Sequence, residues 1–208
     1  MRTPRWENAL RRAVDVVLAA TVLLLGAPLL ALLALVVRLR LGSPVFFRQT
    51  RLGRGGRPFR LVKFRSMRHP APGREAPEFD AERLTRFGGF LRSTSLDELP
   101  EFWNVLRGDM TLVGPRPLPA GYWPRYRGDE YERFLVKPGI TGLAQVNGRN
   151  ACDWDDRLRL DVQYVRTRSL QGDLGILAKT VAVVARRTGV DQDGGVTMTE
   201  LPQGRPGG

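Results

Sequence analysis

Two adjacent carboxylates and one arginine, in the stretch from residue 95 to residue 117, are the groups best placed to do chemistry. Asp97 and Glu98 are neighbours at a helix-start pattern, and Arg116 lies between two prolines in a stiff loop that would aim its guanidinium. A carboxylate can attack phosphorus or bind a divalent metal, and an arginine binds phosphate oxygens through paired N–H donors. In a strongly basic chain, this combination suggests phosphate chemistry.

The same residues also fit a purely structural role. Residues 95–98 match a capping box, in which Ser95 accepts a hydrogen bond from the third amide of the helix and Glu98 accepts one from the Ser95 amide. The helix would then run to about Arg107 and end at Gly108. On spacing alone, capping and catalysis are equally supported, and both remain open at this point.

The overall charge and the scarcity of two residue types narrow the possible chemistry. The 208 residues include 33 Lys and Arg against 21 Asp and Glu, so the net charge of +12 favours an anionic partner such as nucleic acid, anionic lipid or a phosphorylated substrate. Cys152 is the only cysteine and His69 the only histidine. We therefore do not expect a disulfide, a cysteine zinc site, or a Ser-His-Asp or Cys-His mechanism. Carboxylates, arginines, lysines and hydroxyls must do whatever chemistry occurs.

A run of 22 residues without a charge, from Val16 to Val37, is long enough to cross a bilayer as a helix. Arginines flank it on both sides, and positively charged flanks prefer the cytoplasmic face. Pro28, near its middle, removes a helical hydrogen bond and breaks the helix. We therefore predict that residues 1–42 form a re-entrant membrane hairpin, a helix–break–helix with both ends in the cytoplasm, rather than a kinked span. Asp15, at the entry, is expected to pair with one of the two arginines at residues 11 and 12.

Residues 43–187 are predicted to form one mostly helical cytoplasmic domain of the α+β class that lies on the membrane. Ser43–Met67 has the pattern of a β-hairpin with a Gly-rich turn, and Lys63 and Arg65 fall at the end of its second strand. These two basic residues are candidates for phosphate binding. A lysine at a strand edge also has an ordinary structural role, because it discourages edge-to-edge pairing.

The remaining helices follow from apolar periodicity. A short helix over residues 83–92 brings Arg92 to a place just before Ser95, and another helix begins near Asp153. A third, over residues 174–184, has an apolar face and a basic C-terminal end, which suits either core packing or a membrane interface. Residues 188–208 are Gly-rich and polar, and we predict a flexible tail there.

The order of short motifs along the chain resembles that of bacterial sugar transferases of the small monotopic phosphoglycosyl transferase family. The resemblance runs from about Arg11 to Thr180. The matching stretches are the Arg-x-x-Asp entry at residues 12–15, the proline-broken hydrophobic segment, and residues 43–44, 47–49, 51–53, 63–67, 91–92, 95–100, 103–106, 108–110, 112–117, 137–142 and 145–149. No further hydrophobic segment precedes residue 16, so we expect the minimal catalytic form of the family.

This resemblance implies a transferase that moves sugar-1-phosphate from a UDP-sugar to polyprenyl (undecaprenyl) phosphate, with Mg²⁺ as cofactor, on the cytoplasmic face of the bacterial inner membrane. By motif position, Asp97 would be the nucleophile that forms an aspartyl-phosphosugar while UMP leaves, and Glu98 would be its neighbour in the dyad; both would be available to the metal. The phosphate or donor contacts would be Lys63, Arg92, Arg116 and Arg149. The product, a polyprenyl-diphosphate sugar, would begin the membrane steps of O-antigen, capsule, exopolysaccharide or glycoprotein synthesis.

One residue departs from the pattern of the family, because Glu101 stands where glutamine is more usual. It lies one turn after Asp97, so the two carboxylates could raise each other's pKa, or Glu101 could touch the metal. With the resemblance in view, capping and catalysis become compatible. Ser95 would start the helix, and the helix dipole would then favour negative charge on Asp97 and on a nearby phosphate.

A second class of function is a membrane-anchored, non-enzymatic basic protein that holds anionic lipid or nucleic acid. Charge and hairpin alone permit it. No nucleic-acid fold signature is present, and aromatic residues do not alternate with the basic strand, so we expect no nucleic-acid partner. The sequence leaves open which UDP-sugar is used, the pathway, the oligomeric state, and whether Glu98 acts as a metal ligand, a base or a helix cap.

Overall fold

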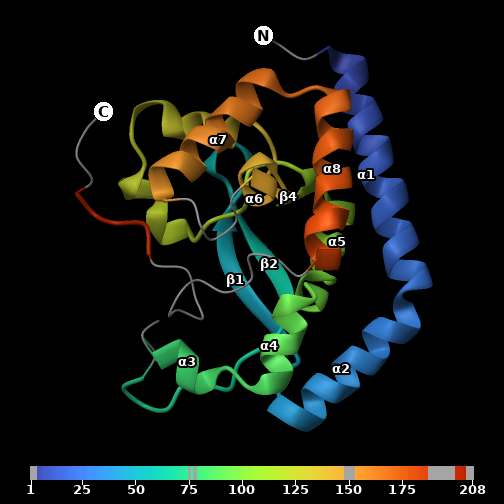
Figure 1. The fold of residues 1–208 in the computed structure, drawn as a ribbon, viewed down its shortest axis with the longest axis vertical. Coiled ribbons are helices and arrows are strands. Elements are labelled where there is room, and N and C mark those ends of the chain that lie inside the picture. The colour runs from blue at the N-terminus through green and yellow to red at the C-terminus, as the bar shows by residue number, and fades with distance from the viewer. Residues whose placement is uncertain (1–3, 75, 77–78, 148–152, 187–199, 205–208) are drawn as a thin grey trace.

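A long bent pair of helices flanks a small body of helices and short sheets in the computed structural model (Figure 1). The structure describes residues 4–74, 76, 79–147, 153–186 and 200–204. The pair consists of α1 (Arg5–Leu25) and α2 (Ala27–Leu41), bent by 63°. Mixed helix and small sheets confirm the α+β class.

The bend lies at Gly26, two residues before the expected break at Pro28. Gly26 N–H donates to Val22 O at 2.9 Å, and a Cβ at Gly26 would lie 2.4 Å from that oxygen, so the position is suited to glycine. Pro28 occupies the first turn of α2, where its missing N–H costs little. The two helices have 21 and 15 residues, because both continue beyond the uncharged run into its polar flanks.

The outer surface of this helix pair is apolar and uncovered. No single helix among the described residues is long and apolar enough to cross a bilayer, but α1 and α2 together pass that test of length and composition. Only a few positions on the two helices are buried against the body, among them Ala19, Leu33 and Val37. The exposed large side chains are Trp6, Leu10, Val14, Val17, Leu18, Leu24, Leu25, Leu29, Leu32, Leu35 and Leu39.

The predicted β-hairpin is confirmed. Strand β1 (Phe46–Leu52) pairs antiparallel with β2 (Pro58–Phe64), and Phe46 lies opposite Phe64. The turn η1 (Arg54–Gly56) contains two glycines with positive φ, 68° at Gly55 and 71° at Gly56, which other residues adopt at a cost. Leu61 and Phe64 point to opposite faces of β2 and are buried in two different hydrophobic clusters, so both faces of the strand are covered here.

The segment that leads to the candidate carboxylates differs from the prediction. After α3 (Asp80–Arg83), helix α4 (Arg86–Ser93) begins three residues later than expected, because Thr85 Oγ1 caps it by accepting from Gly88 N–H at 3.1 Å. A Cβ at Gly88 would lie 1.8 Å from Ser66 O, so glycine at this position lets the helix pack directly on the chain after β2.

The predicted capping box at Ser95 is wrong. Ser95 has a left-handed backbone (φ 56°, ψ 18°) and its side chain caps nothing. The chain instead makes the short 3₁₀ turn η3 (Leu96–Glu98), and α5 (Glu101–Arg107) begins only after Pro100. The predicted end is confirmed, because Gly108 terminates α5 in the left-handed conformation, with φ 85°.

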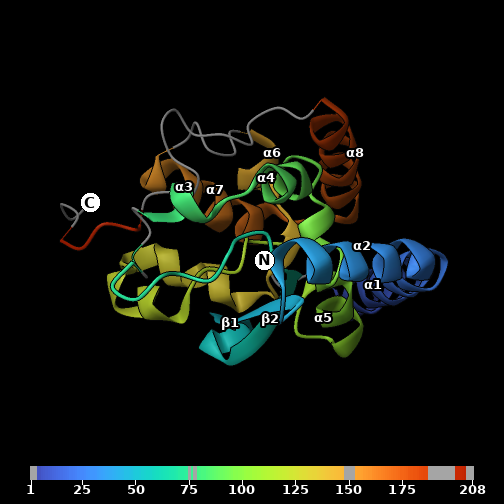
Figure 2. The same ribbon diagram turned by 90° about the horizontal axis from the view of Figure 1, so that it is seen from below.

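The second half of the chain wraps around a second small sheet. Strand β3 (Thr111–Val113) pairs parallel with β4 (Gly139–Thr141), a pairing that was not predicted from the sequence. Between them lie the 3₁₀ segments η4 (Ala120–Arg125) and η5 (Gly128–Leu135). Helices α6 (Leu143–Asn147), α7 (Trp154–Thr167) and α8 (Leu170–Arg186) follow (Figures 1 and 2), and Asp173 near the start of α8 contacts Arg11 of α1.

The end of the chain is partly packed against the body. Of the predicted flexible tail, only residues 200–204 lie among those that the structure describes. There Leu201 is fully buried in a cluster with Leu52, Tyr126 and Phe134, and Leu201 O accepts a hydrogen bond from Arg125 at 2.6 Å. This part of the predicted tail is therefore packed against the body in the structure.

Polar contacts tie α1 to the body, and they differ from the pairing expected for Asp15. Asp15 accepts hydrogen bonds from Thr111 Oγ1 (2.7 Å) and from Leu112 N–H (2.9 Å), not from an arginine side chain. Arg12 donates to Val105 O (2.6 Å) and Leu106 O (2.8 Å), the last carbonyls of α5. The carboxylate is therefore satisfied by the edge of β3, and the arginine by a helix end.

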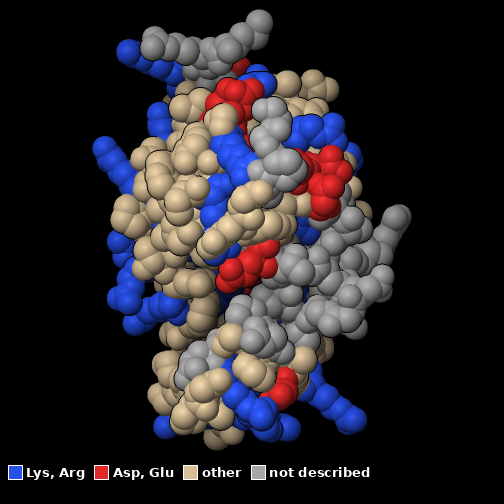
Figure 3. Space-filling view, turned by 90° about the vertical axis from the view of Figure 1, so that its left-hand side faces the viewer, with Lys and Arg blue, Asp and Glu red and all other residues tan. Residues whose placement is uncertain are grey.

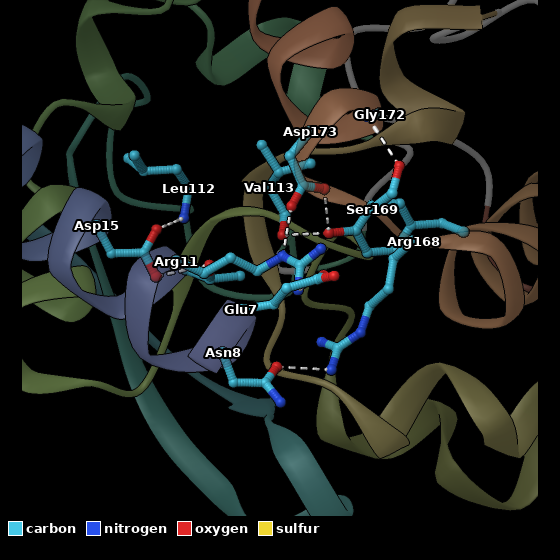
Figure 4. A network of polar contacts seen from close by, with 12 residues as sticks. Glu7, Asn8, Arg11, Asp15, Leu112, Val113, Arg168, Ser169, Gly172 and Asp173 are labelled. Atoms are coloured by element: carbon cyan, nitrogen blue, oxygen red, sulfur yellow. Dashed lines mark hydrogen bonds and ion pairs between the residues drawn. The ribbon is translucent and has the colours of Figure 1, made fainter. Parts of the chain in front are cut away.

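A second network joins α1 to α8 (Figure 4). Arg11 Nε donates to Asp173 Oδ2 at 2.6 Å, and the hydroxyl of Tyr164 lies 2.9 Å from both Asp173 Oδ1 and Val113 O. Three elements therefore meet at one buried carboxylate, and the Tyr164 hydroxyl links it to a fourth, β3, the strand that leads into the Arg116 loop.

Candidate active site

The two candidate carboxylates lie on the η3 turn, between α4 and α5 and facing the end of β2. Their direction is set by the left-handed backbone at Ser95, a strained conformation for a residue with a Cβ. Asn104 on α5 holds β2 in place, because its side chain accepts from Val62 N–H (3.1 Å) and donates to Arg60 O (2.8 Å). These contacts bring Lys63 against the turn.

Glu98 is held by two cations. Its Oε1 accepts from Lys63 Nζ at 2.6 Å and from Arg116 Nη2 at 2.7 Å, so the structure brings together three of the predicted site residues. Burial alone would raise the pKa of Glu98, but the charges of Arg116 and Lys63 outweigh it and hold that pKa well below its ordinary range. Glu98 is therefore a fixed anion that orients both cations.

Asp97 has the opposite character. It is 8% exposed, and its carboxylate has no hydrogen-bond partner among the residues that the structure describes. Burial and the neighbouring charge of Glu98 raise the pKa of Asp97 to about 6, against the pull of Lys63, Arg92 and Arg116. The expected stabilisation of its charge by a helix dipole is not found, because η3 has only three residues. A raised pKa makes a carboxylate more basic and a better nucleophile.

Glu101 lies behind Lys63, on the first turn of α5. Its Oε1 is 3.0 Å from Lys63 Nζ, and the residue is 2% exposed. Burial and the charge of Glu98 raise the pKa of Glu101 to about 7, although Lys63 lowers it. Lys63 is itself buried, which would lower its pKa, but the two glutamates raise it above the ordinary value. Lys63 is therefore a firmly charged lysine shared by two carboxylates.

The other predicted contacts have different fates. Arg92 lies near Asp97. Burial lowers the pKa of Arg92, and the charge of Asp97 opposes that effect. Arg92 Nε also donates to Ser66 Oγ at 3.0 Å. Arg65 points elsewhere, since its guanidinium bonds Leu41 O and Ser43 O and contacts His69. Arg65 thus ties the end of α2 to the hairpin, and we leave it out of the proposed phosphate site. Arg149 lies outside the described residues.

Two arginines near the site were not singled out from the sequence. Arg51 Nη1 donates to Pro117 O at 3.0 Å, and burial together with the charge of Arg116 lowers the pKa of Arg51 to about 10. Arg133 Nη2 donates to Arg116 O at 2.7 Å. Arg51 belongs to a matching motif that could have drawn attention to it, whereas Arg133 lies in a stretch with no local signal.

The wider surface is basic. On the face shown in Figure 3, Lys and Arg side chains line one edge and also lie across the middle and toward both ends, and the acidic side chains form several smaller groups. Such a surface attracts anionic substrates and anionic lipid headgroups. The site can therefore bind phosphate at a reactive, unbonded carboxylate that three cations surround.

Comparison with known proteins agrees with this chemistry. The family model described as "Bacterial sugar transferase" matches residues 6–187. The chain is 45% identical to the uncharacterized sugar transferase EpsL of Bacillus subtilis (strain 168), over 90% of this chain and 93% of that protein. It is also 45% identical to UDP-glucose:undecaprenyl-phosphate glucose-1-phosphate transferase of Caulobacter vibrioides, over 82% of this chain and 68% of that one.

Some relatives are much longer than this chain. The UDP-galactose-lipid carrier transferase of Erwinia amylovora is 42% identical over 86% of this chain, but the match covers only 41% of that protein. Residues 6–187, which the family model matches, contain nearly all the elements described above, including the η3 carboxylates and the Arg116 loop. The chain therefore belongs to the bacterial sugar transferase family.

Proposed function

We propose that this protein transfers sugar-1-phosphate from a UDP-sugar to polyprenyl phosphate, releasing UMP and forming a polyprenyl-diphosphate sugar. The observation that carries the proposal is the Asp97 carboxylate, unbonded among the described residues and surrounded by Lys63, Arg92 and Arg116. The names of the Caulobacter and Erwinia relatives, transferases acting on UDP-sugars and lipid carriers, support the same reaction. The identity of the sugar stays open.

In the first half of the reaction, an Asp97 oxygen attacks the sugar-bearing phosphorus of the donor. The bond from that phosphorus to the bridging oxygen breaks, UMP departs with the electron pair, and an aspartyl-phosphosugar forms. A carboxylate is a weak nucleophile toward an anion, so the phosphate charge must be neutralised. Lys63, Arg92 and Arg116 supply positive charge, and Glu98 keeps two of them in place.

In the second half, an oxygen of polyprenyl phosphate attacks the same phosphorus and displaces Asp97. The nucleophile is already ionised, so no general base is needed, and the scarcity of histidine is no obstacle. The carboxylate returns to its starting state, which completes the cycle. The cations that received the donor phosphate then stabilise the product diphosphate.

Magnesium is the proposed cofactor, and the residues fit a metal that the substrate helps to hold. Among the described residues, no three His, Cys, Asp or Glu side chains come together as a metal cage. Mg²⁺ often binds through one or two carboxylates plus substrate phosphates and waters. Asp97 and Glu98 offer two carboxylates, although Glu98 Oε1 is already taken by cations. The ion would supply further neutralisation of phosphate charge.

We also propose that the α1–α2 pair is a re-entrant membrane hairpin and that the body lies on the cytoplasmic face of the inner membrane. The uncovered apolar side chains of both helices support this, as does the basic end of α2 with Arg38 and Arg40. A lipid-linked acceptor has its phosphate at the membrane surface. A protein anchored in one leaflet would meet that phosphate without extracting the lipid.

The test is UMP release from a panel of UDP-sugars with Mg²⁺ and polyprenyl phosphate in detergent. Asp97→Asn should lose turnover by at least about 10³-fold and should lose the covalent phosphosugar adduct in mass spectra, while melting like the parent. Asp156→Asn, an exposed carboxylate on α7, is the matched control and should stay active. Retained turnover in Asp97→Asn would exclude it as nucleophile. Absence of UMP release with every donor would favour a non-enzymatic lipid-binding role.

A further inference from the structure

The loop that carries Arg116 is fixed at its main chain, not only through its side chain. Its start is held by the β3–β4 sheet: Gly114 N–H donates to Thr141 O at 2.8 Å, and Pro115 O accepts from Gly139 N–H at 3.0 Å. Glycine is required at position 114, where a Cβ would lie 2.5 Å from Lys137 O. The start of the loop therefore cannot shift without breaking the sheet.

The next two carbonyls of the loop are held by two arginine side chains from different elements. Arg116 O accepts from Arg133 Nη2 at 2.7 Å, and Pro117 O accepts from Arg51 Nη1 at 3.0 Å. Arg133 belongs to η5 and Arg51 to β1. Three consecutive carbonyls, from Pro115 to Pro117, thus have fixed donors, and the guanidinium of Arg116 leaves a rigid base to reach Glu98.

Arg133 is the unusual member of this arrangement, because it is a buried cation and each nitrogen of its guanidinium has a hydrogen-bond partner. Its Nε and Nη2 lie 3.2 and 2.9 Å from Asp161 Oδ2, and its Nη1 donates to the Tyr126 hydroxyl at 2.8 Å. Arg133 is 4% exposed and Asp161 is equally buried. Replacing a buried ion pair by apolar side chains is often neutral or stabilising, so stability alone does not explain it. What an apolar residue could not supply is the hydrogen bond to Arg116 O.

We propose that Arg133 is a positioning residue for the transfer reaction, and that it acts by fixing the main chain of Arg116 so that the guanidinium stays aligned between Glu98 and the phosphate. The proposal rests on the proposed function for its kinetic test. Its physical basis is geometric, because a misplacement of about 1 Å in a catalytic group can cost up to about 10²-fold in rate. Lysine at position 133 would keep the positive charge opposite Asp161 but has no fork to reach both Tyr126 and Arg116 O.

The first experiment compares Arg133→Lys with Arg166→Gln. Arg166 is the matched control because it also joins η5 to α7, through Glu132 (2.8 Å) and Asp129, but it lies on the surface and does not touch the Arg116 loop. Arg133→Lys should lower kcat by about 10- to 100-fold and leave KM for the UDP-sugar within about threefold. Arg166→Gln should change both by less than about twofold. Equal losses in the two variants would mean that tying η5 to α7 is what counts, and would overturn the proposal.

The second experiment is a double-mutant cycle with Arg116→Ala. If Arg133 acts only through Arg116, adding Arg133→Lys to Arg116→Ala should cost less than about threefold more in kcat. Fully additive losses would overturn the proposal. If Arg133→Lys fails to fold, Tyr126→Phe takes its place, because it removes only the hydroxyl bonded to Arg133 Nη1. Tyr126→Phe alone should lower kcat by about 3- to 10-fold, and the same double-mutant cycle with Arg116→Ala is then measured.

A measurement independent of activity separates this proposal from the proposed function. Hydrogen–deuterium exchange of the peptide covering residues 112–118 should be faster in Arg133→Lys than in the parent, and unchanged in Arg166→Gln. Unchanged exchange in Arg133→Lys would refute the positioning role even if the enzyme assay works. If exchange is faster in Arg133→Lys but the parent protein releases no UMP, the loop contact is supported and only the transferase function is refuted.

Discussion

Asp97 and Glu98 are neighbours in the chain, yet their environments move the two pKa values in opposite directions. Glu98 accepts hydrogen bonds from Lys63 and Arg116 and stays ionised. Asp97 is buried beside that fixed negative charge and has a pKa of about 6. When two carboxylates are separated in this way, they suit different roles. Glu98 suits the role of orienting the cations, and Asp97 the role of nucleophile. The family resemblance already implied that Asp97 is the nucleophile, but it left the role of Glu98 open.

The buried Glu101 predicts a pH-dependent stability. Its folded-state pKa of about 7 lies above the ordinary 4.5, so the folded protein binds this proton more tightly than the unfolded chain. The contribution of Glu101 to the free energy of unfolding is most favourable below about pH 4.5 and is lost as the pH rises through 7. Glu101→Gln removes that loss. We expect the variant to be more stable than the parent at pH 8, by on the order of 1–3 kcal/mol, with little difference at pH 5.

Thermal melts at the two pH values check this, with the exposed Glu82→Gln as the control that should change neither. A variant that melts lower than the parent at pH 8 would mean that the ion pair with Lys63 outweighs the cost of burial. The departure from glutamine that the sequence pointed out would then have a stabilising role in this protein.

At the residue level, the sequence identified the chemistry but not the local geometry. Asp97, Glu98, Lys63 and Arg116 were found because their types and motifs are local, and three of them meet at one hydrogen-bonded centre. The role of Ser95 was predicted wrongly, since a capping pattern cannot reveal that tertiary contacts force a left-handed residue and a 3₁₀ turn. Arg133 was missed because its partners are 17 and 28 residues away and share no motif with it.

At the scale of elements, α1 is at once part of the apolar hairpin and part of the catalytic body. Its early turns carry Arg12, bonded to the end of α5, and Asp15, bonded to β3. Both contacts join residues more than 90 positions apart. Apolar periodicity could therefore predict the helix but not the elements that it contacts. The two strands of the hairpin, by contrast, are close in sequence and have an evident turn, and they were predicted nearly as found.

The contact between α1 and β3 yields a prediction. Asp15→Ala should leave Leu112 N–H buried without a partner, which costs about 1–3 kcal/mol of stability. Asp15→Asn should cost much less, because its amide oxygen can accept from Leu112 while its NH₂ group donates to Thr111. Denaturant unfolding in detergent measures both. Equal destabilisation by the two variants would show that the negative charge, not the hydrogen bonding, is what this position requires.

At the scale of the whole molecule, a residue near the end of the chain packs into a cluster of the body. Leu201 is 0% exposed, and the cluster that receives it includes Tyr126, the residue that also bonds Arg133. Composition predicted a flexible tail because polar and glycine residues surround this leucine, and a single buried side chain carries no pattern. A short segment at the end of the chain thus packs against the aromatic side of the same body that holds the Arg116 loop.

Truncating this side chain should destabilise the fold. Leu201→Ala leaves a cavity in the aromatic cluster and is expected to cost about 2–4 kcal/mol, a drop of several degrees in Tm. Leu135→Ala, at a leucine that is 62% exposed on η5, should change Tm little. If both variants melt with the parent, the end of the chain does not contribute to the folded core in solution.

The placement of the helix pair relative to the membrane follows from how both of its ends join the body. Early α1 is fixed to α5 and β3 through Arg12 and Asp15, and the last turn of α2 is fixed through Leu41 O, which accepts from Arg65. The side chains near the bend are the most exposed apolar groups of the pair, with Leu24 and Leu25 75% and 79% exposed. A straight crossing would carry one of these anchored ends through the bilayer, away from the body that it contacts.

We therefore expect both ends of the pair to face the cytoplasm. In a Cys152→Ser background, Thr3→Cys and Ser43→Cys should each react with a membrane-impermeant thiol reagent in inverted vesicles and stay protected in intact cells. A cysteine placed at Leu25 should be protected in both preparations, because the bend would lie within the apolar layer. Labelling of residues 3 and 43 from opposite sides would require a true span, and α1 would then have to give up its hydrogen bonds to α5 and β3.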